Sequence, residues 1–327
     1  MVVLHQEVPH TAGDDEQDTL VQAAFVTEAL SALGFAATVL PVTLNLEKAA
    51  RELSALRPAL VFNLVESLGG RGEFIAAAAL LLETLGLPFT GASAAALFLT
   101  SHKLAAKDMM RRADIPTPPW SDRVAARTAA ETVPLPAIIK HVWEHASVGI
   151  TDSAVVNTPD ELGRAAVAAQ GSVFFERYID GREFNIGLLE TGKEIRMLPP
   201  AEICFTDYPD DKPKIVGYEA KWLPDSFEFT HTPVRHTFAE KDAPLLQELE
   251  RIARRAWHTF GLSGYARIDF RVDLSGRPWV LEVNANPCLA PDAGFFKAAA
   301  RAGYTRDTLI EEIVRAALNG DERKQPS

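Results

Sequence analysis

The chain has 327 residues, of which 47% are hydrophobic and 24% are charged, and its formal net charge is −11. This is an ordinary globular composition, and the length predicts two or three domains. The acidic balance, without a basic stripe, argues against nucleic acid as a partner. No apolar run reaches the roughly 18–20 residues of a membrane span, so we expect no membrane association. Cys204 and Cys288 show neither metal-ligand spacing nor a disulfide framework, which together with the absence of a signal peptide predicts a cytoplasmic location.

Strand and helix patterns alternate in the first third of the chain. Gly34 closes a helix that Asp18 is expected to cap, and the apolar run that ends at Val65 is interrupted only by Asn63. The expected elements are strands at residues 2–4, 36–42 and 59–65, helices at 19–33, 46–56 and 74–82, and a short strand at 86–91. This alternation predicts an α/β layer with a parallel sheet.

The middle of the chain begins with a helix at residues 93–113 and a proline-stiffened linker at 115–120. A strand at 137–142, a loop to Gly149, a helix at 159–169 and a strand at 173–178 follow. We place a domain boundary at about residue 97, which gives an N-terminal domain at 1–97 and a central subdomain at 98–180.

The last part is predicted to be a C-terminal subdomain over residues 181–320, with a polar tail at 321–327. Its expected elements are strands at 182–189 and 194–198, a long polar loop at 205–234, a helix at 241–260, a strand hairpin and a final helix at 306–318. A loop of such length is usually functional or disordered.

The hairpin carries the most informative residues. Asp269 lies in the strand at 266–270, and Glu282 and Asn284 share one face of the strand at 280–287, because side chains alternate along a strand. Pairing of the strands can bring these three side chains together, with Arg267 beside them. Such hard oxygen ligands suit Mg²⁺ bound together with a substrate phosphate. The alternative is an ordinary hairpin whose charges face water.

Two lysines are further candidates for phosphate binding. Lys103 lies on the helix before the proline linker, and Lys140 ends the apolar strand after it. A buried ammonium group is costly unless it is paired. A nucleotide phosphate and a carboxylate are both possible partners.

These motifs resemble the ATP-grasp superfamily, and most closely the D-alanine–D-alanine ligases. The resemblance covers most of the chain after about residue 60, and it implies an ATP-grasp fold whose central and C-terminal subdomains clamp ATP. It assigns Lys103 and Lys140 to the ATP phosphates, and Asp269, Glu282 and Asn284 to Mg²⁺, with Mn²⁺ as a possible substitute.

Three further segments match the nucleotide site of the family. His145-Ala146-Ser147-Val148-Gly149 resembles its phosphate lid, in which Gly-Ser-Ser-Val-Gly is usual, and the resemblance assigns Ser147 to the nucleotide. The segment 175–184 resembles the adenosine site, with Glu176 for the adenine amine, the backbone near Tyr178 and Ile179 for the adenine edge, and Glu183 for the ribose. Solvated charges on a strand–turn–strand are the alternative. Tyr218-Glu219-Ala220-Lys221-Trp222 resembles a closing segment whose lysine binds the transferred phosphate.

The substrate half departs from the family. D-alanine–D-alanine ligases position their first D-alanine with a Glu, a Ser and a Tyr, and here Ala146 and Trp222 occupy two of those places. Cys288 replaces a glycine whose backbone approaches the second substrate, and Ala293 replaces a serine. The nucleotide machinery therefore matches the family, whereas substrate recognition does not.

The resemblance implies an ATP-dependent carboxylate–amine ligase that works through an acyl phosphate, with Arg267 and Lys221 stabilising the charge that develops on oxygen. Its partners would be small amino acids or peptides, and family analogy allows a homodimer. An ATP-binding regulator and a carboxylate kinase of the same fold are the alternatives. An NAD-linked enzyme is disfavoured, because the glycine fingerprint of dinucleotide-binding folds is missing.

Overall fold

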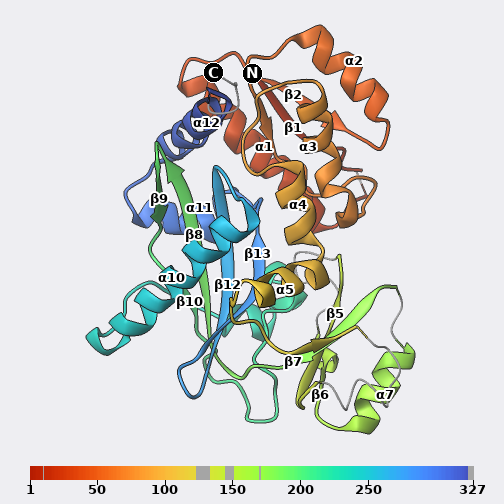
Figure 1. Cartoon of the computed structure of the whole chain (residues 1–327), viewed down its shortest axis with the longest axis vertical. Helices are drawn as coiled ribbons and strands as arrows, with labels where there is room; N and C mark the ends of the chain where they lie inside the picture. Colours follow the sequence, from red (N-terminus) through yellow and green to blue (C-terminus); the bar gives the residue numbers. More distant parts are fainter. Residues whose placement is uncertain (10, 123–132, 144–150, 169–170, 323–327) are drawn as a thin grey trace.

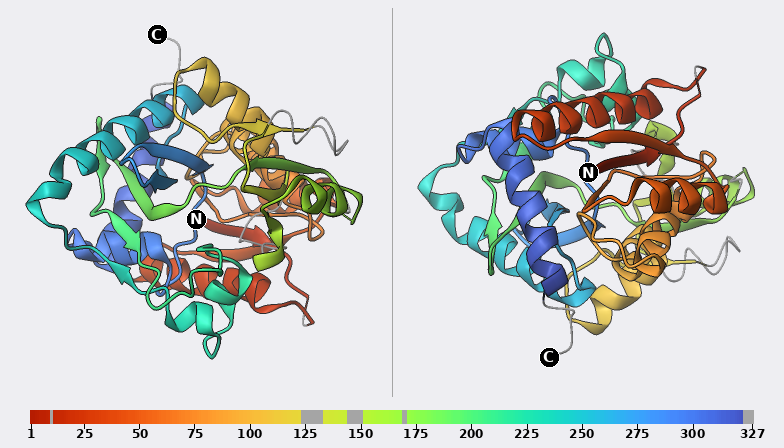
Figure 2. Two further views of the ribbon diagram at one scale, coloured as in Figure 1. Left: turned by 90° about the horizontal axis from the view of Figure 1, so that it is seen from below. Right: turned by 90° about the horizontal axis from the view of Figure 1, so that it is seen from above.

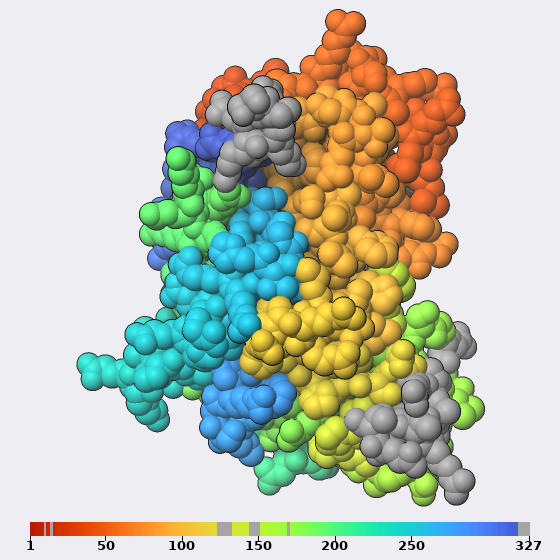
Figure 3. Space-filling view, viewed as in Figure 1, coloured from red at the N-terminus to blue at the C-terminus, as the bar shows by residue number. Residues whose placement is uncertain are grey.

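The computed structural model describes residues 1–9, 11–122, 133–143, 151–168 and 171–322. Its strands form three sheets, which follow one another along the chain. Figure 1 shows the N-terminal sheet and both termini at one end of the molecule, and the central sheet with β5, β6 and β7 at the other end. In the space-filling view of Figure 3, these parts form separate areas of the surface.

The N-terminal sheet is parallel, as predicted. β1 (Val2–Gln6) lies between β2 (Thr38–Val42) and β3 (Val61–Asn63). The helices of this part are α1 (Asp14–Ala32), α2 (Leu46–Leu56) and α3 (Ile75–Thr84), the last preceded by the 3₁₀ turn η1 (Gly72–Phe74).

Two expectations for this part are wrong. Helix α1 begins at Asp14 with Gly13 as its N-cap, so Asp18 lies inside the helix and does not cap it. The described residues 86–91 form no strand, and only Phe89 makes an isolated bridge, to Val61. The apolar run that ends at Val65 forms a strand only over the three residues of β3.

The helix predicted at residues 93–113 is divided into α4 (Ala94–Ser101) and α5 (Lys103–Arg112). His102 interrupts it with an extended conformation (φ −82°, ψ 94°), and its Nδ1 atom accepts a hydrogen bond from the N–H of Ala105 at 3.1 Å. A side chain that caps the following helix stabilises such a break. As a result, Lys103 is the first residue of a new helix.

The central sheet is antiparallel and has the order β4-β7-β5-β6. Its strands are β4 (Trp120–Ser121), β5 (Ala137–His141), β6 (Val155–Val156) and β7 (Val173–Arg177). The 3₁₀ turn η2 (Asp152–Ala154) and helix α7 (Pro159–Ala168) complete the described part. A small core of its own, with Val133, Leu162 and Phe175, lies between α7 and the sheet.

The C-terminal sheet has the order β11-β10-β8-β12-β13, with β9 also paired to β8. Its strands are β8 (Gly181–Thr191), β9 (Glu194–Met197), β10 (Ala201–Ile203), β11 (Val234–Arg235), β12 (Tyr265–Asp273) and β13 (Pro278–Asn284). Its helices are α8 (Tyr218–Trp222), α9 (Phe227–Thr230), α10 (Ala243–Phe260), preceded by the 3₁₀ turn η3 (Glu240–Asp242), α11 (Gly294–Arg301) and α12 (Arg306–Glu322). Strands β10 and β11 and helices α8, α9 and α11 were not predicted from the sequence, and α12 continues into the predicted tail.

One hydrophobic core joins the two ends of the chain. Val3 and Leu30 of the N-terminal layer belong to the same buried cluster as Tyr265, Phe295 and Ile310 of the C-terminal part. Figure 2 shows α12 beside the N-terminal layer when the molecule is seen from above. The central sheet has its own separate core. The domain boundaries at residues 97 and 180 stay predictions.

Candidate active site

A cavity of about 640 Å³ lies where the three parts of the chain meet. The side chains around it come from α1, from the segment after β3, from β5 and β7, and from the C-terminal sheet with its loops. It contains all of the predicted site residues that the structure describes, namely Lys103, Lys140, Glu176, Tyr178, Ile179, Glu183, Lys221, Arg267, Asp269, Glu282 and Asn284. Ser147 and Ala146 lie outside the described residues.

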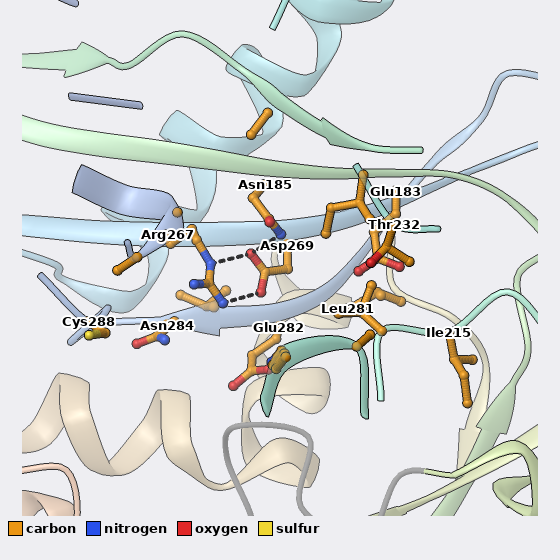
Figure 4. A pocket seen from close by; sticks show the side chains of 18 of the residues that line it. Glu183, Asn185, Ile215, Thr232, Arg267, Asp269, Leu281, Glu282, Asn284 and Cys288 are labelled. Carbon is orange, nitrogen blue, oxygen red and sulfur yellow. Dashed lines mark hydrogen bonds and ion pairs between the residues drawn. The ribbon is translucent and has the colours of Figure 1, made fainter. Parts of the chain in front are cut away.

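The register of the hairpin positions its acidic residues. Asp269 of β12 pairs with Glu282 of β13, and Arg267 pairs with Asn284. On the other side of β12, Asp269 pairs with Asn185 of β8. Figure 4 shows Arg267, Asp269 and Asn185 in contact, with Glu282 and Asn284 on the neighbouring strand. The predicted grouping of the three oxygen donors is therefore present in the structure.

Arg267 and Asp269 form a two-pronged ion pair. The guanidinium atoms Nε and Nη2 donate to the two carboxylate oxygens at 2.7 and 2.8 Å, and Asn185 Nδ2 donates to Oδ1 at 2.8 Å. Such fork-to-fork pairs are strong and fix both side chains. Burial would lower the pKa of Arg267, but Asp269 and Glu282 outweigh it and raise that pKa above its ordinary value, so the side chain stays cationic.

The hairpin fits a magnesium ion by the chemistry of its donors, since Asp269, Glu282 and Asn284 offer two carboxylates and an amide oxygen. Within the described residues, no group of three or more His, Cys, Asp or Glu side chains is placed to hold a metal ion. The protein alone therefore supplies an incomplete oxygen shell, as is usual for Mg²⁺ sites that phosphate groups and water complete.

A buried cluster of two lysines and one glutamate faces the same cavity. Glu176 of β7 pairs with Lys107 of α5 at 2.5 Å and also with Lys140 of β5, and both Glu176 and Lys107 are 1% exposed. Burial would raise the pKa of Glu176, but the two ammonium groups hold it below its ordinary value. Burial lowers the pKa of Lys107. A carboxylate is thus the partner of Lys140 in this structure.

The predicted adenosine residues lie at one end of the cavity. Glu183 of β8 forms an ion pair with Arg271 of β12 at 2.8 Å. The two residues lie opposite each other in the strand register. The hydroxyl of Tyr178 accepts a hydrogen bond from the N–H of Lys214 at 2.9 Å. In Figure 4, Glu183 and Cys288 mark opposite ends of the view, with the hairpin acids between them.

Lys221 reaches the hairpin from α8. Its ammonium group lies in the cavity, where removal from bulk water and the guanidinium of Arg267 lower its pKa, while Glu282 and Asp269 act in the opposite direction. A cation at this position, next to the predicted metal ligands, is suited to a phosphate oxygen. Trp222, which follows it, also lines the cavity.

The end of the cavity near Cys288 contains acids that sequence reasoning missed. Asp18 comes from α1 and Glu66 from the segment after β3. The thiol of Cys288 donates to Asp18 Oδ2 at 3.0 Å. Burial, Glu66 and Asp18 raise the pKa of this thiol, so Cys288 stays protonated.

Signals in the sequence could have found some of the missed residues. Lys107 follows Lys103 by about one helical turn, and Asn185 lies two residues after Glu183, on the same face of β8. Asp18 and Glu66 gave no such signal, because their partners are distant in sequence.

Known proteins with similar sequences and folds identify the family of this chain. A family model described as D-ala D-ala ligase C-terminus matches residues 109–315. The uncharacterized protein y4sG of Sinorhizobium fredii is 31% identical over 79% of this chain and 74% of its own length. The D-alanine–D-alanine ligase of Synechococcus sp. (strain JA-3-3Ab) is 33% identical over 73% of this chain and 71% of its own. The solved structure of the D-alanine–D-alanine ligase from Bacillus anthracis complexed with ATP has a TM-score of 0.73 at 20% identity, and the match covers 99% of both chains.

The fold and the family model together define an ATP-grasp protein of the ligase class, which confirms the fold and class predicted from the motifs. The chain belongs to the D-alanine–D-alanine ligase family.

Proposed function

We propose that this protein binds ATP with Mg²⁺ and uses it to join a carboxylate to an amine. The observation that carries this proposal is the meeting of four cationic side chains and the acidic hairpin in one cavity. The cations are Lys103, Lys140, Lys221 and Arg267. Family membership and the ATP complex of the Bacillus anthracis relative support the nucleotide.

In the proposed reaction, an oxygen of the substrate carboxylate attacks the γ-phosphorus of ATP. ADP leaves, and an acyl phosphate is formed. The amine nitrogen then attacks the acyl carbon, phosphate leaves, and the nitrogen loses a proton to give the amide. No side chain of the protein needs to act as a nucleophile.

The chain contributes charge and position. Arg267 is fixed by Asp269 and stays cationic, so it can stabilise the oxyanion of the second step. Lys221 approaches from α8 and is suited to the transferred phosphoryl group. A magnesium ion, held by Asp269, Glu282 and Asn284, would neutralise charge on the phosphates.

The part of the cavity proposed to hold the adenosine contains residues of β7 and β8 and of the segment between them. Tyr178, Ile179 and Glu183 line the cavity, where they would contact adenosine. Figure 4 shows Glu183 away from Cys288. Glu176 holds Lys107 and Lys140 in this structure. A bound triphosphate offers Lys140 a second anionic partner, which would leave Glu176 more available to an adenine amine.

Substrate identity is a separate matter. Trp222 and Cys288 line the cavity at the positions where the family has a tyrosine and a glycine. We therefore propose a small amino acid or peptide as substrate, without assigning D-alanine. Nucleotide binding without ligation, or phosphorylation of a carboxylate as the final step, are the competing functions.

The test follows ADP and phosphate release from Mg-ATP over a panel of D- and L-amino acids and dipeptides. Asp269→Asn and Glu282→Gln should each abolish Mg²⁺-dependent release, whereas Glu248→Gln on the exposed face of α10 should not. Product analysis by mass spectrometry separates ligation from acyl phosphate formation alone. Unchanged release by both hairpin variants would contradict the metal assignment.

Within the described residues, no helix is long and apolar enough to cross a membrane. A cytoplasmic location and a homodimer stay predictions.

A further inference from the structure

Two acidic residues meet at the Cys288 end of the cavity and belong to no part of the machinery described above. Asp18 lies on α1 and Glu66 follows β3, and both are half-buried. Asp18 raises the electrostatic cost of ionising Glu66, as expected for neighbouring carboxylates. Asp292 stands at the exposed rim of the same end and adds to the negative charge felt by Asp18.

Buried polar side chains hold these acids in place. Glu66 Oε1 accepts from Gln22 Nε2 at 3.1 Å, and the backbone N–H of Glu66 donates to Gln6 Oε1 at 3.1 Å. Gln6 in turn donates to Thr19 at 2.7 Å. Gln6, Thr19 and Gln22 are at most 8% exposed. Such a fully bonded buried network fixes the position of the groups that it carries.

The same network joins the acids to the loop after β13. Gln22 Oε1 accepts from the N–H of Leu289 at 2.9 Å, and Cys288 donates to Asp18. A glutamine that bonds to both Glu66 and Leu289 ties the N-terminal layer to the loop that follows the metal hairpin. Asp18 and Glu66 are thus built into the wall of the site and are not free surface acids.

Among the described residues, neither Asp18 nor Glu66 forms an ion pair, and Lys297 on the cavity wall pairs with neither. Arg267 is close enough to lower the pKa of Glu66, yet its guanidinium is bonded to Asp269. Half-buried carboxylates are costly without compensation, so the ligand is expected to supply positive charge.

An organic cation fits this charge better than a metal ion. No group of three or more His, Cys, Asp or Glu side chains within the described ranges is placed to hold a metal. Ammonium groups, in contrast, bind well to one carboxylate each in a charge-assisted hydrogen bond. The indole N–H of Trp222, which lines the same cavity, is buried and has no hydrogen-bond acceptor among the described residues. This N–H group could donate a hydrogen bond to a polar ligand.

One carboxylate would be enough for a neutral amino acid. Each such molecule brings a single ammonium group, and the attacking amine must be uncharged when it reacts. The family resemblance gives one Glu to the first D-alanine, whereas this cavity has two built-in acids and a third at its rim. The additional carboxylates would be matched by a second basic group on the substrate.

We propose that the protein selects a substrate with a second basic group beside its α-amino group, a diamino acid or a peptide that contains one, and that Asp18 and Glu66 determine this preference. The inference rests on the proposed ligase function, because it places the amino-acid substrate at this end of the cavity. Glu66 and Asp18 act as specificity residues, and neither takes part in the chemical steps.

The experiment compares pairs of compounds that differ by one amine. 2,3-Diaminopropionate is matched with alanine, and ornithine with norvaline, each in both D and L forms. Calorimetry with the full chain in the presence of Mg-ADP measures binding, and ADP release from Mg-ATP measures turnover. The variants are Asp18→Asn and Glu66→Gln, with Glu7→Gln as the control, since Glu7 is exposed and lies outside the cavity wall.

A diamino compound should bind, or show a kcat/KM, at least about tenfold better than its partner, the ratio typical of one charge-assisted hydrogen bond. Asp18→Asn and Glu66→Gln should each reduce this ratio, with little effect on the neutral partner, while Glu7→Gln keeps it. Equal binding of both partners by the parent, or an unchanged ratio in both variants, would overturn the inference. A binding preference without any ADP release would support the inference and contradict the ligase function.

Discussion

Glu176→Gln is the most demanding test of the buried cluster that faces the cavity. The substitution keeps the shape of the side chain and removes its charge. Lys107, 1% exposed, and Lys140, 13% exposed, then lose their carboxylate. Breaking a buried ion pair from one side costs about 3–5 kcal/mol, because the remaining charge is left uncompensated. We expect a loss of free energy of unfolding in that range.

The loss of free energy of unfolding in Glu176→Gln should depend on pH. Burial lowers the pKa of Lys107 below that of an unfolded lysine. Without Glu176 this shift grows, so the folded variant binds fewer protons than the unfolded chain and its stability rises with pH. The difference between variant and parent should therefore be largest near neutral pH and should shrink toward the ordinary pKa of lysine.

Urea unfolding followed by circular dichroism measures the change, with Glu248→Gln in an exposed pair on α10 as the control. That control should change stability by less than about 1 kcal/mol. In a double-mutant cycle, Lys107→Met should cost less in the Glu176→Gln background than in the parent. A stability of Glu176→Gln within about 1 kcal/mol of the parent, or additive effects in the cycle, would refute the reasoning.

Two further predictions concern the backbone beside the site and its pH dependence. Gly181 has φ +139°, and a Cβ atom there would lie 2.0 Å from the carbonyl oxygen of Val272, whereas Gly192 at φ +63° has open space. Gly181→Ala should lower the melting temperature far more than Gly192→Ala, which carries only the roughly 1–2 kcal/mol of left-handed strain, and equal losses would contradict the close approach of β8 to β12. Burial raises the pKa of Glu66 to about 7, with Gln22 and Arg267 acting against it and Asp18 with it. The preference for a diamino substrate in kcat/KM should therefore fall as the pH drops through 7, and Glu66→Gln should flatten that profile. Asp18, Arg267, Tyr265 and the protonated Cys288 are other charged or titratable groups that interact with this carboxyl, so a profile unchanged in Glu66→Gln would assign the titration to one of them.

The arrangement of acidic residues on the β12–β13 hairpin could be predicted from the sequence. Strand alternation and turn residues were sufficient to predict that Asp269 can come close to Glu282 and Asn284, since both signals are local. The structure then shows that Asp269 pairs directly with Glu282. The parallel N-terminal layer followed from the alternation of strands and helices. The roles of these residues in metal and nucleotide binding stay predictions, but their convergence in one cavity could be expected from the motifs.

Local propensity failed at the starts of two helices. The helix expected at 93–113 is broken because His102 caps α5 with its own ring nitrogen. Asp18 looked like a helix cap, yet α1 starts one turn earlier and turns that carboxylate to the cavity.

The sequence by itself predicted the residues of the proposed nucleotide half of the cavity, because their motifs are short and each lies on one or two neighbouring elements. Only the tertiary structure decided the other half. Asp18, Glu66 and Cys288 lie in three distant segments, and the shared core of the N-terminal and C-terminal parts brings them together. Contacts between residues this far apart depend on how whole layers pack, and no local pattern in the chain records that packing.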